Sequence, residues 1–324
     1  MGVRIIGTGS YVPDSVVTNE HLRARMGFEP EWIVKRTGIH ERRHALPDQA
    51  TSDLCYEAGK RCIESSGIDR KKIDLFVLGT FTSDMTFPAT SCLVQDRLDL
   101  TCPAIEIQAA CAGFVYSLIT AATYILAGVA ETALVIGGDC NSRILNPADI
   151  KTYPLFGDGA GAVLLTRGRP DQGIVAYSMG ADGSGGMLIH RPACGSRMMP
   201  TQEAIAESKH LLVMDGRAVF RWATNILTDT IKDVLAYAKL EPNEVDLYIP
   251  HQANIRIINA AIDVLHIDRG RVFNNLERYG NTSGGSIPLA LDEALAEGRL
   301  KEGQLLLISG FGAGLAWGTA IMRW

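Results

Sequence analysis

Apolar and polar positions alternate along the chain in two ways, and each predicts one kind of element. Short runs rich in β-branched and other apolar residues are typical of strands that are buried on both faces. Longer helix-like stretches separate these runs, which predicts an α/β fold whose sheets are covered by helices on both sides. The predicted strands are Val3–Ile6, Leu75–Leu78, Ala133–Ile136, Ala162–Leu165, Leu247–Ile249 and Leu305–Ile308. The predicted helices are Thr51–Ser66, Cys111–Ala127, Gly216–Ala238, Ile255–Leu265 and Ser286–Glu297.

The chain contains an internal repeat. Ile73-Asp-Leu-Phe-Val77 resembles Val245-Asp-Leu-Tyr-Ile249, and the later strand Ala133–Ile136 resembles Leu305–Ile308. Both pairs are 172 residues apart, which is too long for a solenoid and indicates two similar βα halves.

The polar segment 166–173 is the natural connection between the halves, because its Gly, Pro and charged residues favour a loop. We therefore predict an N-terminal half over residues 1–170 and a C-terminal half over residues 171–324. At the repeat offset Cys111 falls opposite Ser283, so the loops around them are expected to occupy related places.

Composition narrows the function classes. The formal net charge of −5 argues against nucleic-acid binding, which usually requires a basic face. The seven cysteines include no Cys-x-x-Cys pair and no zinc spacing. Because the start of the chain also lacks a signal-peptide pattern, we expect free thiols, no metal site and a cytoplasmic protein.

One uncharged segment, Ile107–Ala130, is long enough to span a bilayer. It contains Gln108, several hydroxyl side chains and glycines, and no basic cluster follows it. We interpret it as a helix buried in an α/β core rather than a membrane span.

The first candidate for chemistry is Cys111, in Ala109-Ala-Cys-Ala-Gly-Phe114. It lies where a strand ends and a long apolar helix is predicted to begin. The partial positive charge of a helix N-terminus favours the thiolate, which is the nucleophilic form. Its small neighbours would let a thioester approach. The alternative from this segment alone is a buried structural cysteine.

Two further candidates follow apolar strands or precede helices. His251 follows a predicted strand and Pro250, at a kind of position where catalytic groups of α/β proteins gather; a loop-bridging histidine is the alternative. Asn281 lies in a turn two residues before the repeat mate of Cys111, so it is expected near the same cleft. Its amide can donate a hydrogen bond without titrating, although a plain loop would also explain it.

Three glycine-rich segments invite a nucleotide or oxyanion interpretation. The turn expected at Ser309–Leu315 follows a strand, and its N–H groups could face a developing oxyanion; a tight β-turn is the alternative. Gly7-Thr-Gly9 and Gly157-Asp-Gly-Ala-Gly161 lack the third glycine of a dinucleotide site at the required place, which excludes a nicotinamide site of that type.

Taken together, the Cys111, His251 and Asn281 motifs resemble those of the β-ketoacyl-acyl-carrier-protein synthase III family, the initiating condensing enzymes of type II fatty acid synthesis. Elongating condensing enzymes use two histidines and 3-hydroxy-3-methylglutaryl-CoA synthases use a glutamate base, whereas this chain offers Cys, His and Asn. The resemblance runs nearly end to end and includes Ile5–Pro13, Glu31–Ile39, Phe87-Pro88, Phe156–Gly161 and Phe311–Gly318.

The resemblance implies a thiolase-like fold in a homodimer, with two duplicated βα halves in five α-β-α-β-α layers. It also implies a ping-pong reaction that makes 3-oxoacyl-acyl-carrier protein. Cys111 would accept the acyl group of an acyl-CoA, and His251 and Asn281 would stabilise the enolate left when malonyl-acyl-carrier protein decarboxylates. The backbone N–H groups of Cys111 and Ala313 would form the oxyanion hole, and no cofactor is implied.

Other roles follow by resemblance, position by position. CoA would be bound by Trp32, which would stack on the adenine, and by Arg36, Lys151 and Asn254. Arg221 and Arg256 would contact the acidic carrier protein. Phe220 and Phe311 would line the acyl pocket, and Phe87 would limit the pocket of the neighbouring subunit.

Three departures from the family leave the acyl donor open. Ile150 stands where a common pattern has an adenine-contacting arginine, Thr282–Ser286 reads Thr-Ser-Gly-Gly-Ser, and the stretch Met187–His210 looks long. A secondary-metabolism relative with another starter or acceptor is therefore an alternative. A non-catalytic partner subunit is a weaker one, because such subunits usually lose the nucleophile.

Overall fold

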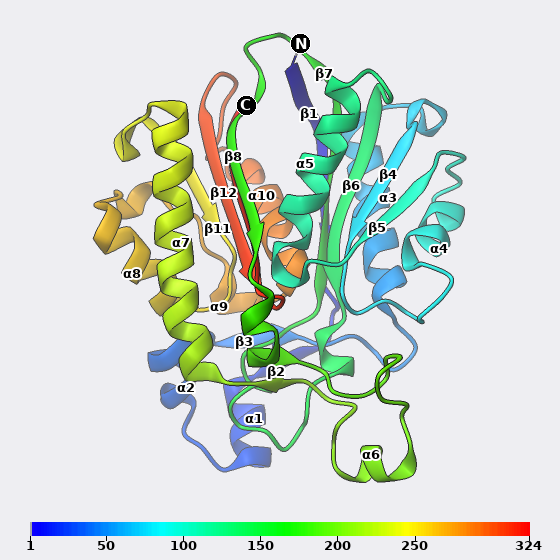
Figure 1. Cartoon of the computed structure of the whole chain (residues 1–324), viewed down its shortest axis with the longest axis vertical. Helices are drawn as coiled ribbons and strands as arrows, with labels where there is room; N and C mark the ends of the chain where they lie inside the picture. The colour runs from blue at the N-terminus through cyan, green and yellow to red at the C-terminus, as the bar shows by residue number, and fades with distance from the viewer. Residues whose placement is uncertain (1) are drawn as a thin grey trace.

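The computed structural model describes residues 2–324 and shows five layers (Figure 1). Two β-sheets enclose a middle layer of two helices, and further helices cover the outer face of each sheet. The middle layer is α5 (Gly113–Leu126) and α10 (Ser286–Ala296). The outer layers are α3 (Thr51–Ser66) with α4 (Thr90–Arg97), and α7 (Gly216–Ala238) with α8 (Ile255–Leu265). The expected five-layered α/β architecture is confirmed.

The two sheets repeat one plan. In each, two neighbouring strands run parallel and a long antiparallel strand follows the second of them. The first sheet has the order β1 (Gly2–Tyr11), β7 (Gly159–Gly168), β6 (Thr132–Asp139), β4 (Leu75–Gly79), β5 (Ala104–Ile107). The second has the order β11 (Leu247–Pro250), β12 (Leu305–Gly312), β13 (Ala316–Arg323), β8 (Gly173–Ala181).

Smaller elements gather at one end of the layers, the lower end of Figure 1. Two short antiparallel pairs are β2 (Val16–Thr18) with β3 (Glu41–Arg43), and β9 (Ile189–His190) with β10 (Val213–Met214). The short helices are α1 (Asn19–Met26), α2 (Pro30–Thr37), α6 (Gln202–Ala206) and α9 (Leu276–Tyr279).

Most of the predicted elements are present. Helices α3, α7 and α8 have the predicted bounds, and all six predicted strands lie within observed ones. The strands β5, β8 and β13 of the two sheets were missed, as were the short strands β2, β3, β9 and β10 and the helices α1, α2, α4, α6 and α9. In β8, at an edge of the second sheet, exposed residues alternate with buried or half-buried ones, so the segment lacks the continuous apolar run that marks a central strand.

Two predicted elements need correction. The helix predicted from Cys111 begins at Gly113, because a 3₁₀ turn over Ala110–Ala112 precedes it. The glycine-rich turn predicted at Ser309–Leu315 is mainly strand, since β12 continues through Gly312 by pairing with β13. Glycine was read as a turn signal here, and cross-strand hydrogen bonding overrides that local signal.

The duplication is visible in the loops as well as in the strands. The residues Ala110 and Ser283 both have positive φ, 45° and 53°, and each precedes one helix of the middle layer. These helices start at Gly113 and Ser286, 173 residues apart, so the structural counterpart of Cys111 is Gly284 and not Ser283. The predicted division at residue 170 falls between β7 and β8.

The uncharged segment 107–130 contributes a helix of 14 residues, α5, to the middle layer. Nine of its residues are buried, from Gly113 to Ile125. Among residues 2–324, no helix combines the length and the hydropathy that crossing a membrane would require.

Candidate active site

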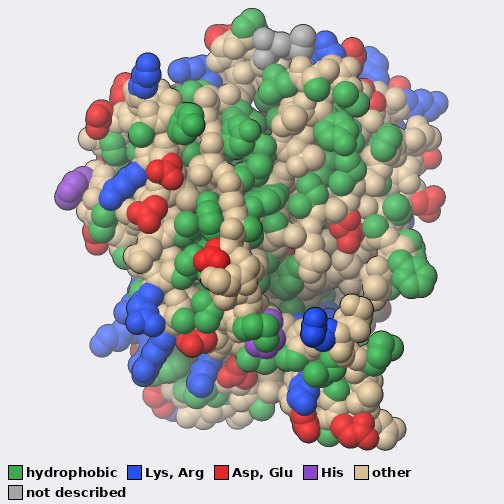
Figure 2. Space-filling model, in the orientation of Figure 1, with side chains coloured by type: hydrophobic (Ala, Val, Ile, Leu, Met, Phe, Trp, Pro, Cys, Tyr) green, Lys and Arg blue, Asp and Glu red, His purple; other side chains and the backbone are tan. Residues whose placement is uncertain are grey.

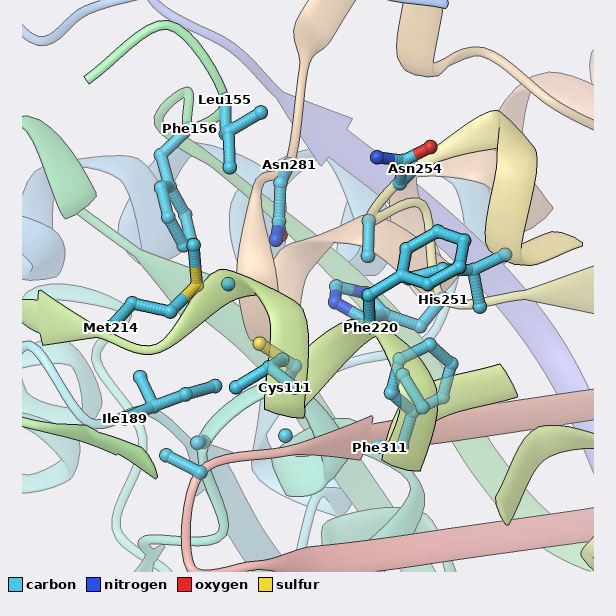
Figure 3. Close-up of a pocket in the computed structure, with 18 of the residues that line it drawn as sticks. Cys111, Leu155, Phe156, Ile189, Met214, Phe220, His251, Asn254, Asn281 and Phe311 are labelled. Carbon is cyan, nitrogen blue, oxygen red and sulfur yellow. The ribbon is translucent and has the colours of Figure 1, made fainter. Parts of the chain in front are cut away.

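A pocket with about 770 Å³ of empty volume brings the three predicted catalytic residues together (Figure 3). Cys111 comes from the turn before α5, His251 from the end of β11, and Asn281 from the loop before α10. Its other walls are mostly apolar, as is usual for a small-molecule site. Among the other predicted site residues, Asn254, Phe220, Phe311 and Ala313 also line the pocket.

Cys111 lies at the base of the pocket and is partly exposed. Its Sγ lies 3.0 Å from the hydroxyl of Ser283. Burial raises the pKa of the Cys111 thiol to about 12, and the hydrogen bond from Ser283 opposes that rise. Burial of the thiol therefore opposes the thiolate form that the helix N-terminus was expected to favour.

His251 is almost fully buried, with 1% of its surface exposed. Its backbone N–H donates to the carbonyl of Ser309 at 2.7 Å, which fixes the end of β11 against β12. Its Nδ1 lies 2.7 Å from the Ser286 hydroxyl, and the N–H of Gln252 donates to the same oxygen. The hydroxyl has one proton to donate, and of these two partners only Nδ1 can accept it, so we assign the proton to the bond with Nδ1. The proton of the neutral imidazole is then on Nε2, as a donor.

Two features keep the His251 ring neutral and oriented. Burial lowers its pKa to about 3. The Phe311 ring meets it edge to face, with centroids 5.3 Å apart and an angle of 74°. At neutral pH the ring therefore acts as an uncharged hydrogen-bond donor of fixed orientation.

Acid is expected to destabilise the fold through His251. An unfolded imidazole protonates near pH 6.5, whereas the buried ring stays neutral down to about pH 3. Between these values the unfolded state binds more protons, so the free energy of unfolding falls by up to about 1.4 kcal/mol per pH unit as the pH drops.

Urea unfolding at several pH values should show that the free energy of unfolding depends less steeply on pH in His251→Gln than in the wild type. His21→Gln, which changes an exposed imidazole, should keep the wild-type dependence; equal slopes in all three proteins would contradict the assignment.

Asn281 presents its amide nitrogen to the pocket. Its side-chain oxygen accepts a hydrogen bond from the N–H of Ser283 at 2.8 Å, which leaves the NH₂ group as the free end. Its backbone is held on both sides, by the Leu155 carbonyl at 2.8 Å and the Gly157 N–H at 3.0 Å. In Figure 3 the side chain points between His251 and Cys111. The pocket therefore contains two fixed neutral donors beside one thiol.

The end of β12 approaches the nucleophile closely. A Cβ atom at Gly312 would lie 2.8 Å from the backbone nitrogen of Cys111 and 3.0 Å from its Cβ, so only glycine fits. Ala313 follows directly and lines the pocket. The end of β12 that carries Ala313 thus lies against the backbone of Cys111.

The remaining predicted residues lie outside this pocket. Trp32 is 40% exposed and stacks with Phe28 and with the Arg36 guanidinium, which lies 4.1 Å from a ring centroid. Lys151, Arg221 and Arg256 are exposed, and the Arg256 guanidinium lies 5.2 Å from the centroid of the Phe220 ring. Phe87 is 82% exposed and does not line the pocket of its own chain.

Several pocket residues were missed by sequence reasoning. Ser283 and Ser286 touch the sulfur and the imidazole, yet a serine in a turn carries no signal for such a contact. Much of one wall comes from segment 187–214, whose length had been noted but whose place had not been predicted. The apolar residues missed include Phe81, Leu155, Ile189, Leu212, Met214 and Trp222.

Comparisons with known proteins agree with this geometry. Residues 105–183 match the family described as 3-oxoacyl-[acyl-carrier-protein] synthase III, and residues 235–324 match its C-terminal family. A β-ketoacyl-[acyl-carrier-protein] synthase III from Rhodopirellula baltica is 50% identical over 100% of this chain and 99% of its own. The crystal structure of 3-oxoacyl-[acyl-carrier-protein] synthase III from Aquifex aeolicus has a TM-score of 0.92 and 40% identity, with 100% of both chains covered.

A second similar structure is that of an enzyme from a polyketide pathway. The priming β-ketosynthase of the R1128 polyketide biosynthetic pathway has a TM-score of 0.91 and 33% identity, over 99% of this chain and 96% of its own. The similarities in sequence and fold cover the whole chain and agree with the Cys, His and Asn side chains gathered in the pocket. The chain belongs to the β-ketoacyl-[acyl-carrier-protein] synthase III family.

Proposed function

We propose that the enzyme condenses a short acyl-CoA, such as acetyl-CoA, with malonyl-acyl-carrier protein. The products are 3-oxoacyl-acyl-carrier protein, CoA and CO₂, and the reaction initiates type II fatty acid synthesis without a bound cofactor. The observation that carries this proposal is the pocket in which one thiol lies beside two neutral donors, His251 and Asn281. A thiol suits acyl transfer, and neutral donors suit a negative charge that develops on a carbonyl oxygen.

In the first half-reaction the Cys111 sulfur attacks the acyl-CoA thioester. The bond between the acyl carbon and the CoA sulfur breaks, and the thiol proton ends on the released CoA. Because burial holds the pKa of Cys111 near 12, the thiol must lose its proton as the attack proceeds. The Ser283 hydroxyl lies 3.0 Å from the sulfur, where it can stabilise the developing thiolate.

In the second half-reaction the malonyl thioester loses CO₂ and becomes an enolate. Nε2–H of His251 and the amide of Asn281 would donate to the thioester oxygen, where the charge gathers. The enolate carbon then attacks the acyl group on Cys111. The N–H groups of Cys111 and Ala313 would hold the resulting oxyanion, before the tetrahedral intermediate collapses and releases the cysteine.

The proposal is tested by incubating the enzyme with acetyl-CoA and malonyl-acyl-carrier protein. Equal amounts of CoA, CO₂ and 3-oxoacyl-acyl-carrier protein should form, and the acyl-enzyme should appear before the second substrate is added. CO₂ release without a new carbon–carbon bond would show a decarboxylase instead. Failure of every acyl-CoA in a panel to give an acyl-enzyme would point to a carrier-protein donor.

The adenine of the donor is proposed to stack on Trp32. Trp32→Ala should then raise the apparent KM for acyl-CoA by roughly 5- to 150-fold, because stacking of one base on an aromatic ring contributes about 1–3 kcal/mol. The Arg36 guanidinium covers one face of the Trp32 ring, so it must move aside if the adenine stacks on that face. The CoA phosphates, which Arg36 is expected to contact, would hold the guanidinium in its new position. The matched control is acyl-pantetheine, which has no adenine: its KM should be the same for both proteins. An equal effect on both donors would place the adenine elsewhere.

Arg221 and Arg256 are proposed to contact the carrier protein. Both are exposed, and Arg256 lies over Phe220, a residue of the pocket wall. A cationic group at the pocket entrance favours an acidic partner whose prosthetic arm must enter there.

The enzyme is proposed to be a cytoplasmic homodimer. β5 is an edge strand, and an apolar groove between α5, β8 and α7 exposes Leu126, Tyr177 and Tyr237. Figure 2 shows hydrophobic side chains gathered over the region of these three elements. Contiguous exposed apolar residues of this kind are typical of protein interfaces. Light scattering would show twice the chain mass for a dimer. All seven cysteines are free, which fits a reducing compartment.

A starter unit other than acetyl-CoA is a second candidate. The similarity to a priming ketosynthase of a polyketide pathway and the wall contributed by Ile189, Leu212 and Met214 favour this possibility. An acyl-CoA panel of increasing chain length distinguishes the two, because the preferred donor should give the highest rate of acyl-enzyme formation.

A further inference from the structure

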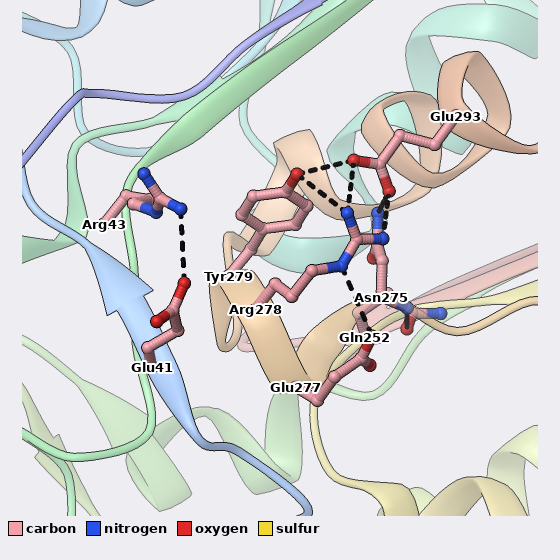
Figure 4. A network of polar contacts seen from close by, with 8 residues as sticks. All are labelled: Glu41, Arg43, Gln252, Asn275, Glu277, Arg278, Tyr279 and Glu293. Carbon is pink, nitrogen blue, oxygen red and sulfur yellow. Dashed lines mark hydrogen bonds and ion pairs between the residues drawn. The ribbon is translucent and has the colours of Figure 1, made fainter. Parts of the chain in front are cut away.

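Glu293 lies at the centre of a polar network whose members do not line the pocket (Figure 4). It is on α10, its side chain is 21% exposed, and its carboxylate accepts four hydrogen bonds. The donors are Asn275, Tyr279 and both terminal nitrogens of Arg278. The positive charge of Arg278 also balances the negative charge of the carboxylate. The proposed reaction assigns no role to this carboxylate, which does not line the pocket.

One arm of the network leads to His251. Oε2 of Glu293 accepts from the side-chain amide of Asn275 at 2.8 Å. The backbone N–H of Asn275 donates to the Gln252 side chain at 3.1 Å, and that side chain donates to the Pro250 carbonyl at 2.7 Å. Both intermediates are buried, with exposed fractions of 2% and 1%. Gln252 directly follows His251, so this arm fixes the backbone that carries the imidazole.

The other arm leads to Asn281. The Tyr279 hydroxyl donates to Oε1 of Glu293 at 2.6 Å, and the neighbouring Arg278 pairs with both carboxylate oxygens. Tyr279 precedes Gly280, whose φ of 65° turns the chain toward Asn281. The carboxylate thereby holds the start of the turn that aims the amide into the pocket.

Helix α10 also holds the imidazole directly. Ser286, which contacts Nδ1 of His251, lies seven residues before Glu293, so both lie on the same face of the helix. One rigid helix face therefore connects the two loops that carry the donors. Cys111 lies instead in the 3₁₀ turn Ala110–Ala112 before α5, and its contact with this part of the chain is the Ser283 hydroxyl, 3.0 Å from Sγ, in the turn that precedes α10.

We propose that Glu293 is a positioning residue for the condensation step, because it sets the distance between the donors of His251 and Asn281. This inference rests on the proposed function. Loss of the carboxylate should slow the condensation half-reaction far more than the acylation of Cys111. Decarboxylation and condensation need both donors on one oxygen, whereas acylation of Cys111 does not.

The test compares Glu293→Gln with the wild type in each half-reaction. A glutamine side chain has one acceptor oxygen and one NH₂ group, whereas both carboxylate oxygens of Glu293 accept hydrogen bonds. The NH₂ group would therefore face a donor from one of the two arms, and that arm would be weakened. Acylation is measured by intact mass after rapid mixing with acyl-CoA, and condensation by product formation from preformed acyl-enzyme. We expect condensation to fall about 10-fold or more and acylation by less than about 3-fold, since small misplacements of reacting groups have large effects.

The adjacent residue supplies the matched control. Asp292 accepts two hydrogen bonds of 2.6 Å, from Thr8 and Ser10 of β1, and neither leads to a loop of the pocket. Asp292→Asn should leave the ratio of the two rates at the wild-type value. The milder variant Tyr279→Phe, which removes a single hydrogen bond to Glu293, should lower the ratio even if Glu293→Gln does not fold.

Two results would overturn the inference. One is a wild-type ratio in Glu293→Gln and in Tyr279→Phe. The other is an equal decrease of the ratio in Asp292→Asn, which would show a general effect of damage to α10. Neither result affects the proposed function, which is tested by the wild type alone.

Discussion

Replacement of Cys111 by alanine is expected to abolish the acyl-enzyme and to lower the condensation rate by on the order of 10³-fold or more. The side chain that forms the covalent bond is lost, and no other group on the pocket wall is a comparable nucleophile among the residues described. Alanine removes one sulfur and its contact with Ser283. The expected change in stability is only about 1 kcal/mol, the usual value of one hydrogen bond.

The measurement is intact-protein mass after mixing with a panel of acyl-CoAs. The wild type should gain the mass of one acyl group, and the preferred donor should react fastest. Cys92 is exposed on α4 and is the matched control: Cys92→Ala should acylate like the wild type. An acyl group that still attaches to Cys111→Ala would place the nucleophile elsewhere, and peptide mapping would then locate it.

Replacement of His251 by alanine is expected to lower condensation by roughly 10²- to 10³-fold, the effect of removing one donor to a developing oxyanion. Acylation of Cys111 should change far less, because the imidazole is proposed to donate to the malonyl thioester. The neutral state of the ring, with its pKa near 3, and the Ser286 contact at Nδ1 both support a donor rather than a base.

The two half-reactions are measured separately, by mass for acylation and by CO₂ release for decarboxylation. Asn281→Ala should give the same division, since its amide is proposed to donate a hydrogen bond to the same oxygen. The thermal stability of both variants must be measured as well, because each substitution leaves buried polar partners unpaired. The expected loss of folding stability is about 1–3 kcal/mol. If His251→Ala slowed acylation as much as condensation, the imidazole would be acting on the thiol, contrary to the proposed division.

The amino-acid sequence by itself determined the chemistry of the site and the plan of the fold. The types of side chain at 111, 251 and 281 can be read directly, and each lies beside an apolar run that marks a strand or a helix. The repeat of 172 residues indicated two related halves. These features are local or periodic, so they are present in the chain before any tertiary contact forms.

The bounds of some elements required tertiary pairing. The end of β12 looked like a glycine turn until its pairing with β13 was known. β8 is an edge strand whose exposed residues hide the strand pattern. In both cases hydrogen bonds to distant strands decide the backbone conformation, and no local propensity encodes them.

The working state of the site was decided by the tertiary structure alone. The Ser286 contact fixes the His251 tautomer across 35 residues, and the Ser283 contact reaches Cys111 across 172. The helix N-terminus beside Cys111 is visible in the sequence, whereas the burial that raises the pKa of its thiol is not. Desolvation depends on every atom that surrounds a group in space, so ionisation, tautomer and orientation become defined only when the fold brings these segments together.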